Sequence, residues 1–468
     1  MNSYRIPQSE PLCSPETGGH DAPRIIPLMG RSIRESGPPD WNRVYRDGLA
    51  RPCILLPNPD RTGYVVLDSV ALSSGVLAIG GIGSGKTNVI REIVRQLLEQ
   101  VSSRDTVIIF DTKGDYARAF YDPGNPNHVI LGSPDTYPTA TLWNLFGEVT
   151  SLDSPGAQRA RREEMNRARS LAKRMFAGRE SESQPFFTLT AMDLMAKAMI
   201  HLIRQSRMTG DRSLLCNSAL RDFFRKADPD VWRRVLTQDN PDFKASAVYF
   251  GGSRGDMGAS ILATLNSAAE DLLGSFFGDG GPQDTFSIRS AMRQGGKTIF
   301  IEYDMEIAEV LIPVYSLLVD QAIKIQTAQG GNKAGKLYLV VDELKLLNLQ
   351  LDDAVNFGRG QGVHVVAACQ NVNQIINEYG RERAMSMLNG YSTCFAFRNP
   401  DSETRDCVSA RFGKIYQSVV CDPLRKPLAV MREGHTLEDC DLLSLKRGQA
   451  AVEIAWQEKP FLFQFAQY

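Results

Sequence analysis

The sequence predicts an α/β fold, in which a mostly parallel sheet carries helices on both faces and an all-α domain is inserted into it. The first observation is an alternation of short apolar, β-rich runs with helical patterns from about residue 60 onward. Such alternation is typical of parallel strands connected by helices. The second is a stretch from about 150 to 290 where helical patterns follow one another and strand signals are scarce. Because the alternation then resumes, we expect one sheet assembled from both sides of the insertion.

The expected elements follow this division. Before the insertion, strands at 76–80 and 105–111 enclose a helix over 86–101. The insertion shows four helical patterns, over 157–177, 186–206, 214–236 and 258–274. After it come strands at 296–304, 336–343, 363–369 and 392–398, with helices over 306–327, near 350–358 and over 372–388. The segment 445–465 is expected to form two strands joined by a turn at Gln457–Glu458.

Length and composition exclude several classes of protein. The chain has 468 residues, of which 43% are hydrophobic and 23% are charged, so it can bury a sizeable core in two to four domains. Lys and Arg number 53 against 54 Asp and Glu, which gives a net charge of -1. The whole surface is therefore no polycation, and any contact with nucleic acid must be local. The 8 cysteines are scattered without a Cys-x-x-Cys pair, which favours reduced thiols of the cytosol over disulfides or a zinc site.

The apolar segments do not predict a membrane span. A spanning helix needs about 20 consecutive, mostly apolar residues. The two most apolar helical patterns carry charges: Asp193 and Lys197 within 190–204, and Asp320 and Lys324 within 309–325. Residues 1–40 are rich in Pro, Gly and Ser and show neither a signal sequence nor a hydrophobic period, so they are expected to form a flexible arm. The expected location is the cytoplasm, or the inner face of the cell membrane through a partner.

The strongest motif is a glycine-rich phosphate loop. A full G-x-x-x-x-G-K-[ST] pattern follows the strand at 76–79 and precedes the helix that begins at 86. Its glycines let consecutive backbone N–H groups face a phosphate, and the helix N-terminus adds partial positive charge. The lysine reaches the β- and γ-phosphates of ATP, and the hydroxyl that follows it coordinates Mg²⁺. The eight nucleotide-binding residues are Gly80, Gly81, Ile82, Gly83, Ser84, Gly85, Lys86 and Thr87.

Two carboxylates follow a second buried strand. Five apolar residues at 337–341 lead directly into Asp342 and Glu343. Ligands bind at the carboxyl ends of strands in open α/β sheets, so we expect this pair to lie at the same edge as the phosphate loop. Asp342 is assigned to the magnesium shell and Glu343 to the activation of the attacking water. The phosphate loop and this acidic pair together predict a nucleoside-triphosphate hydrolase.

Two further residues are either catalytic or merely exposed polar residues of loops. Gln370 follows the strand at 363–369 and could sense the γ-phosphate or orient water. Arg359 lies in a glycine-flanked loop, from which it could reach across a subunit boundary and stabilise charge on the phosphoryl group. From spacing alone, each could equally be an exposed polar loop residue.

Two charged segments are weaker signals. Asp111-Thr112-Lys113-Gly114-Asp115 follows the strand at 105–111 and is interpreted as a tight turn with a helix cap rather than as catalytic residues. A helix of the insertion carries a basic stretch that is either a solvated face or a contact for nucleic acid: Arg159, Arg161, Arg162, Arg167, Arg169, Lys173 and Arg174.

In combination, the motifs IGGIGSGKT, FDTKGD, LVVDEL, FGRGQGVHVVAACQN and NGYSTCFAFRNPDSET resemble the type IV secretion coupling proteins of the TraG/TraD class. The resemblance runs from about 60 to 465 and includes the order of the parts. It implies a RecA-like, homo-hexameric motor that hydrolyses ATP with Mg²⁺ and drives single-stranded DNA with its bound relaxase toward a secretion channel. It gives phosphate roles to Lys86 and Thr87, and metal and water roles to Asp342 and Glu343. By the same carry-over, Gln370 is the sensor and Arg359 the arginine finger.

The chain departs from this family in one respect. Most members begin with transmembrane helices, and none is expected here, so a separate anchor protein or the secretion channel would provide the membrane contact. Two alternatives stay open. One is a soluble motor like the HerA and FtsK translocases that serves DNA processing or defence. The other is a receptor for protein substrates of a secretion system that uses ATP as an assembly switch.

These expectations divide the chain into four segments. The first is a flexible N-terminal arm and lead-in over 1–59, followed by the first part of the nucleotide-binding domain over 60–149. The all-α insertion domain covers 150–290, and the second part of the nucleotide-binding domain covers 291–468.

Overall fold

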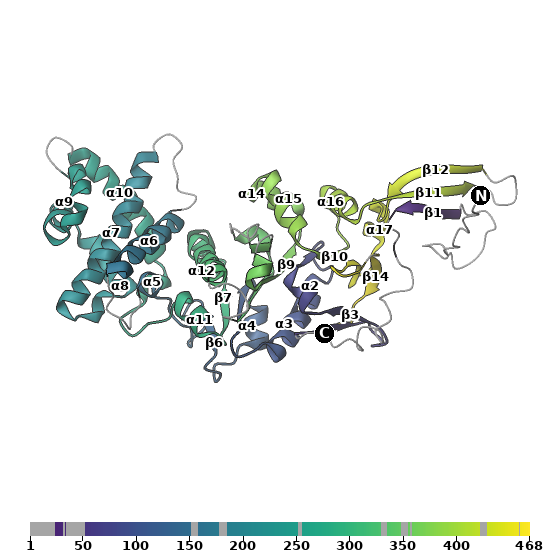
Figure 1. The fold of residues 1–468 in the computed structure, drawn as a ribbon, viewed down its shortest axis with the longest axis horizontal. Helices are drawn as coiled ribbons and strands as arrows, with labels where there is room; N and C mark the ends of the chain where they lie inside the picture. The colour runs from purple at the N-terminus through teal and green to yellow at the C-terminus, as the bar shows by residue number, and fades with distance from the viewer. Residues whose placement is uncertain are drawn as a thin grey trace.

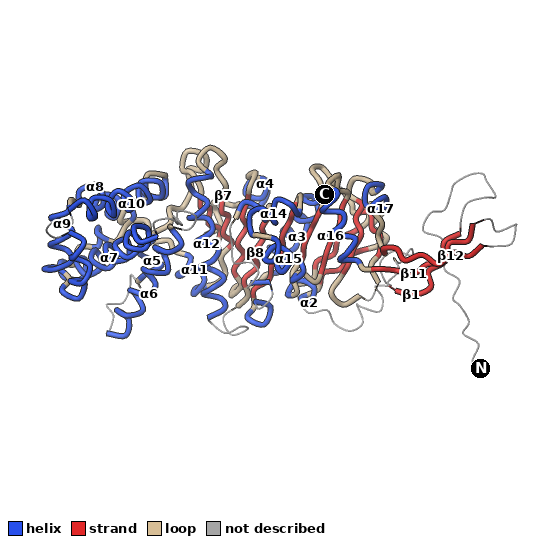
Figure 2. The backbone as a smooth tube through the Cα atoms, turned by 90° about the horizontal axis from the view of Figure 1, so that it is seen from above, coloured by secondary structure: helices blue, strands red, loops and turns tan. Residues whose placement is uncertain are grey.

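The fold is elongated, with a group of helices at one end, a large sheet in the middle and a small sheet at the other end (Figure 1). It was obtained as a computed structural model. The structure describes residues 24–30, 33, 52–150, 158–176, 185–250, 255–328, 335–347, 354–355, 358–421, 428–457 and 459–468. Both small and large sheets are visible from above in Figure 2.

The large sheet has nine strands in the order β14-β13-β10-β4-β9-β8-β5-β7-β6. Adjacent strands from β10 to β6 are parallel, and β13 and β14 add an antiparallel pair beside β10. The α/β fold with a mostly parallel sheet, predicted from the sequence, is therefore confirmed. The strands are β4 (Val76–Ile79), β5 (Thr106–Asp111), β6 (His128–Leu131), β7 (Thr298–Glu302), β8 (Leu337–Val341), β9 (Val363–Cys369), β10 (Thr393–Phe397), β13 (Gln449–Glu453) and β14 (Phe461–Gln464).

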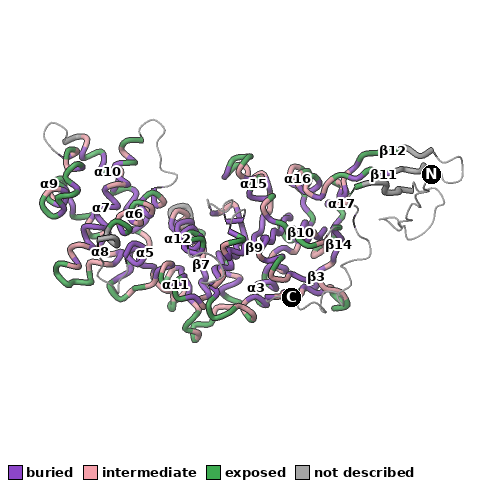
Figure 3. Tube along the Cα trace, viewed as in Figure 1, coloured by how far each residue is buried: buried purple, intermediate pink, exposed green. Residues whose placement is uncertain are grey.

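Helices cover both faces of this sheet, because its central strands are apolar on both sides. Along β5, Val107 and Ile109 belong to one hydrophobic cluster, whereas Ile108 and Phe110 belong to the other. The first cluster includes buried residues of α2 (Ser69–Ser73), α3 (Lys86–Gln100) and α4 (Asp115–Phe120). The second includes α12 (Ala308–Ala328), α14 (Val372–Tyr379), α15 (Arg381–Gly390) and α16 (Ser402–Phe412). Figure 3 shows the buried sheet between these partly exposed layers.

The described residues of the insertion are mostly helical. We call α6 to α10 the helical unit: α6 (Gln158–Met175), α7 (Pro185–Thr209), α8 (Asn217–Lys226), α9 (Pro229–Arg234) and α10 (Gly255–Leu273). Two short helices, α5 (Leu145–Val149) and α11 (Ile288–Gln294), lie where the chain leaves and re-enters the sheet domain. The single helix expected over 214–236 is wrong. Asp228 caps a new helix there and Pro229, which lacks an N–H group, occupies its first turn.

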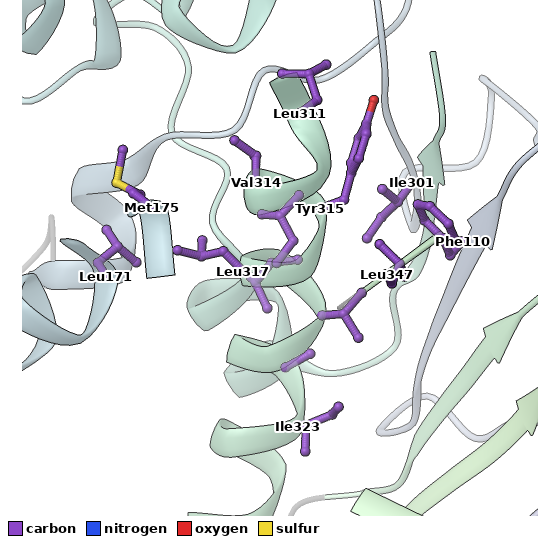
Figure 4. Packing of buried hydrophobic residues seen from close by; sticks show 14 of the residues in the cluster. Phe110, Leu171, Met175, Ile301, Leu311, Val314, Tyr315, Leu317, Ile323 and Leu347 are labelled. Carbon is purple, nitrogen blue, oxygen red and sulfur yellow. The ribbon is translucent and has the colours of Figure 1, made fainter. Parts of the chain in front are cut away.

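Helix α12 joins the helical unit to the sheet. Leu317 of α12 lies beside Leu171 and Met175 of α6, whereas Tyr315 points the other way, toward Phe110 and Ile301 of the sheet (Figure 4). A ring contact supports the packing of α12 against the sheet, since the ring centroids of Tyr315 and Phe110 are 5.8 Å apart. One continuous hydrophobic core therefore connects both parts of the molecule.

The segment before residue 60 contains strands that the sequence analysis did not predict. β1 (Arg24–Gly30) pairs with β11 (Lys414–Cys421), which pairs with β12 (Leu428–His435) to form the small three-stranded sheet. β2 (Ile54–Pro57) and β3 (Tyr64–Leu67) form a hairpin across the expected boundary at 59–60. The expectation of an arm without packed elements is therefore wrong for residues 24–30. Most of the helix expected near 350–358 lies outside the described residues.

Within the described part of the chain, α7 is long and apolar enough to cross a membrane by length and composition. The sequence analysis did not expect any such segment. In its most apolar 18-residue window, 78% of the residues are buried inside the protein. Two of the charges of this helix are paired, because Lys197 donates to Asp193 one turn away and to Ser246. A core helix of a folded domain has these properties.

Candidate nucleotide site

The predicted phosphate loop and acidic pair lie at one edge of the large sheet. Parallel register places Ile79 of β4 beside Cys369 of β9, and Val341 of β8 beside Ala367 of β9. The residues that follow these strands therefore emerge together at the carboxyl edge. The acidic strand is not the immediate neighbour of the phosphate-loop strand, since β9 lies between them. This arrangement places Gln370, at the end of β9, between the loop and the carboxylates.

The glycine-rich loop has the backbone that its sequence predicts. Gly83 and Gly85 have φ angles of 70° and 117°, in the left-handed region that other residues rarely adopt. Ile82 is exposed at the tip of the loop, whereas Ser84 is buried. Among the residues that the structure describes, no side chain caps the N-terminus of α3, which begins at Lys86. The first N–H groups of this helix and its partial positive charge are therefore available to an anion.

Neighbouring segments hold the loop in place. The Gly81 N–H donates to the Arg398 carbonyl at 2.9 Å, and the Gly448 N–H donates to the Ser84 carbonyl at 2.8 Å. A Cβ on Gly85 would lie 3.0 Å from the Cα of Gly448. The loops after β10 and before β13 therefore brace the phosphate loop. The sequence analysis did not identify these contacts, which depend on the pairing of distant strands.

Lys86 is folded beneath its own loop. Its ammonium group is buried and donates to the carbonyl oxygens of Gly80 and, at 2.9 Å, of Gly81. Burial lowers the pKa of this lysine, and the charges of Glu343 and Asp342 act in the opposite direction. The lysine and the acidic pair are therefore close enough for their charges to interact.

The two carboxylates are buried at the end of β8. Burial raises the pKa of Asp342, while Lys113 and a hydrogen bond from Tyr116 lower it. Burial also raises the pKa of Glu343, and the charges of Lys345 and Lys86 lower it. Oε1 of Glu343 has no hydrogen-bond partner among the described residues. A buried carboxylate with a raised pKa and a free oxygen has the properties of a general base.

Asp111 acts as a helix cap, as the sequence analysis expected. Its carboxylate accepts N–H groups of Asp115, Tyr116 and Ala117 at the start of α4. Tyr116 and Lys113 also lie near the carboxylates, although neither was assigned to the site from the sequence. Tyr116 donates to Asp342, and Lys113 is exposed but close enough to affect the pKa values of Lys86, Asp342 and Glu343. The FDTKGD motif was the available signal for Lys113, whereas the sequence offered none for Tyr116.

Gln370 and Arg359 occupy opposite ends of β9. Gln370 is half-buried at the carboxyl edge, and its backbone carbonyl accepts the side-chain amide of Asn399 at 2.8 Å. Arg359 is exposed in the turn Gly358–Gln361, before the strand begins. A strand of seven residues spans roughly 20 Å. The structure therefore brings Gln370 to the site but separates Arg359 from the phosphate loop of its own chain.

The basic stretch of α6 divides into paired and exposed residues. Arg174 is half-buried and lies 2.7 Å from the buried Asp320 of α12, so it holds α6 against that helix. Arg167 pairs with Glu163 one turn away, and Arg169 lies 3.6 Å from Asp193. Arg162 and Lys173 are exposed, and the side chains of Arg159 and Arg161 lie outside the described residues.

The chain is similar to proteins of bacterial conjugation. It is 24% identical to the coupling protein TraD of Escherichia coli K12 over 350 residues, which are 72% of this chain and 43% of TraD. It therefore spans less than half the length of this curated relative. Among solved structures it is similar to the conjugative coupling protein TrwBdeltaN70, with a TM-score of 0.70, 19% identity and 94% of each chain covered. TrwB in complex with ADP and Mg²⁺ gives a TM-score of 0.68 at 18% identity, covering 97% of this chain and 96% of TrwB.

A family model covers most of the sequence. Residues 62–418 match the family described as type IV secretion-system coupling protein DNA-binding domain. The match includes the phosphate loop, the acidic pair, the helical unit and the strand that precedes Gln370. The chain therefore belongs to the type IV secretion-system coupling protein family, and its fold is the RecA-like P-loop fold of TrwB.

Proposed function

We propose that this protein is an ATPase that moves DNA as a coupling protein of conjugative transfer. The observation that carries the proposal is the convergence of Lys86, Asp342 and Glu343 at one edge of the sheet, in a chain of the coupling protein family. Single-stranded DNA with a bound relaxase is the proposed cargo, and a secretion channel is its destination. TrwB is described as a conjugative coupling protein, and one of its structures holds ADP and Mg²⁺.

The described residues fit a magnesium nucleotide. The backbone of the phosphate loop is curled at Gly83 and Gly85, and the buried Oγ of Ser84 has no partner among the described residues. The Thr87 hydroxyl and the Asp342 carboxylate are the hard oxygen donors that Mg²⁺ prefers. Bound there, the ion would neutralise charge on the phosphates.

The side chains of the site then have distinct roles. Lys86 exchanges its two carbonyl partners for phosphate oxygens, so an anionic acceptor replaces two uncharged ones. Glu343 accepts a proton from the attacking water, for which its free Oε1 is suited. Gln370, between the loop and the carboxylates, senses whether the γ-phosphate is present.

The position of Arg359 supports a ring of identical subunits. Since Arg359 lies at the far edge of its own sheet, it can stabilise a transferring phosphoryl group only in a neighbouring subunit. The proposed assembly is a homo-hexamer. A motor that passes DNA to a channel works at the inner face of the cell membrane, held there by its own anchor or by a partner protein.

The test is a steady-state ATPase assay with and without single-stranded and double-stranded DNA. The proposed function predicts Mg²⁺-dependent hydrolysis that single-stranded DNA stimulates. Lys86→Ala should remove hydrolysis, whereas Glu343→Gln should still bind ATP but hydrolyse it at least a hundredfold more slowly, because only the base is lost. Glu433→Gln, on the distant three-stranded sheet, is the matched control and should retain the native rate.

The same assay separates the alternatives. Slow hydrolysis that ignores DNA would favour a receptor for protein substrates that uses ATP as a switch. Stimulation by DNA without any association with a relaxase, tested by co-purification, would favour a motor of DNA processing or defence.

A further inference from the structure

A groove of about 380 Å³ lies at the junction of the helical unit and the sheet domain. Three helices form it: α6, α11 and α12. Four of its lining residues are cationic, and polar side chains lie between them. Its cationic and amide side chains are Asn166 and Arg167 of α6, Arg289 and Arg293 of α11, and Gln321 and Lys324 of α12. We call this groove the basic junction.

The basic junction lies at the edge of the sheet opposite the nucleotide site. Helix α12 leaves the carboxyl end of β7 and runs back, so that its last turns reach the edge where the strands begin. Gln326 fixes them there, since its amide donates to the carbonyls of Gly335 and Gln361, which precede β8 and β9. At the end of α11, the Gly296 N–H donates to the carbonyl of Asp105, just before β5.

Three of the four cations of this groove lack a carboxylate partner in the described part of the chain. Among the described residues, Arg289, Arg293 and Lys324 form no ion pair within 4.0 Å, whereas Arg167 pairs with the half-exposed Glu163. Two nearby carboxylates are already engaged. Glu148 accepts the backbone N–H groups of Ile288 and Arg289 and the indole N–H of Trp143, and Asp320 pairs with Arg174.

The cations also repel one another. Burial lowers the pKa of Arg289 to about 10, and the charge of Arg167 contributes further to this decrease. The Nε of Arg289 donates to the backbone carbonyl of Glu148 at 2.8 Å, which holds the guanidinium in the groove. Partial desolvation lowers the pKa of Lys324 as well, with additional repulsion from Arg174 and Lys173, while the charge of Asp320 acts in the opposite direction. An arrangement of this kind is stabilised by an anion that neutralises several cations at once.

The neighbouring surface favours an extended anion. Lys173 is exposed on α6, one turn beyond Ser170 of the groove, and is close enough to Lys324 to lower its pKa. Positive charge therefore continues along α6 beyond the groove. A strand of phosphodiesters presents charges in such a row, whereas a single small anion would use the groove alone.

We propose that the basic junction binds the phosphate backbone of single-stranded DNA, and this proposal rests on the proposed function of a DNA motor. The contacts are ionic and carry no sequence information, as a motor that moves along any sequence requires. Helix α12 spans the sheet from the nucleotide edge to the junction, so the proposed DNA contact and the nucleotide site lie at opposite ends of one helix.

The test compares two double charge reversals of equal size. Arg293→Glu with Lys324→Glu changes two exposed cations of the junction. Arg234→Glu with Lys244→Glu is the control, since both residues are exposed cations of the insertion without an ion pair among the described residues. Anisotropy of a fluorescent single-stranded oligonucleotide measures Kd over a salt series, and thermal melting verifies that both variants fold.

The expected result is a Kd at least tenfold higher for the junction variant, with a smaller salt dependence. Each lost phosphate contact reduces the slope of log K against log salt by about 0.7 for single strands. The control should bind as the native protein does. If the native chain binds DNA and the junction variant binds it equally well, this inference is wrong while the proposed function stands.

Two other outcomes of this test would have different meanings. If the native chain neither binds single-stranded DNA nor shows DNA-stimulated hydrolysis, the proposed function itself fails, and the inference with it. If the native chain binds one more equivalent of inorganic pyrophosphate than the junction variant, whose phosphate loop is intact, while DNA affinity is equal in both, the groove is a site for a free anion and the inference is overturned.

Discussion

The hydroxyl of Tyr116 donates a hydrogen bond of 3.2 Å to Oδ1 of Asp342, although 226 residues separate the two in sequence. Tyr116 lies at the start of α4, just after β5, and Asp342 follows the adjacent strand β8. Both side chains are buried. The hydrogen bond stabilises the charged form of the carboxylate and fixes the direction of its oxygens. Tyr116 is therefore expected to orient the proposed metal ligand.

We expect Tyr116→Phe to weaken magnesium binding. Without the hydroxyl, the pKa of Asp342 rises and the carboxylate is free to rotate. Loss of a partner of this kind typically reduces metal affinity 10- to 100-fold. The measurement is the Mg²⁺ concentration that gives half-maximal ATPase activity. Tyr121→Phe is the matched control, because its hydroxyl bonds Thr139 away from the site. An unchanged magnesium requirement in Tyr116→Phe would argue that Asp342 does not bind the metal.

Lys113 provides a prediction about pH. Burial raises the pKa of Asp342, and the charge of Lys113 lowers it. In Lys113→Gln the pKa of Asp342 should rise, so the carboxylate becomes protonated at a higher pH and competes less well for Mg²⁺. The acidic limb of the ATPase pH profile should therefore move to higher pH. Lys113→Arg retains the charge and should retain the native profile. Equal acidic limbs in the Gln and Arg variants would contradict this electrostatic role.

Elements with a local signal in the sequence were predictable, whereas those that depend on distant partners were not. The phosphate loop was predictable because its glycines, lysine and threonine lie within eight consecutive residues, and the strands at 337–341 and 363–369 because they are short, mostly apolar runs. β1 was missed because its partner β11 lies almost 400 residues away, and a strand of this kind has no periodicity of its own. Tyr116 was missed for the same reason, since its role exists only through the pairing of β5 with β8.

The site shows the same division between local and distant information. Asp342, Glu343 and Gln370 were assigned from their positions at strand ends, because parallel strands share one carboxyl edge. The sequence did not show that β9 lies between β4 and β8, since order in a sheet is set by tertiary packing. Nor did it show that Arg289 and Arg293 approach Arg167, because these residues lie on separate helices.

The contact of α12 with α6 leads to a prediction about stability. Leu317 is buried between the helical unit and the sheet domain (Figure 4). Leu317→Ala would leave a cavity there and should destabilise the fold by about 2–5 kcal/mol. Leu443→Ala removes the same atoms from a residue that is 38% exposed and should have a much smaller effect. Thermal denaturation compares the two variants, and similar melting temperatures would show that the contact of α12 with α6 is loosely packed.

The last prediction concerns Arg359 and Lys86, which lie at opposite edges of one sheet. If the arginine completes the site of a neighbouring subunit, each active site contains the phosphate loop of one chain and Arg359 of another. Arg359→Ala and Lys86→Ala should each be inactive alone, because every site in either ring lacks one essential group. In rings mixed from the two variants, some interfaces join an intact Arg359 to an intact Lys86, so part of the ATPase activity should return. Subunit exchange must first be verified, for example by energy transfer between labelled chains. Arg381→Ala, at another exposed arginine, is the control and should be active without mixing. Verified mixed rings without activity would show that Arg359 does not act on the neighbouring site, since the distance along β9 already excludes its own.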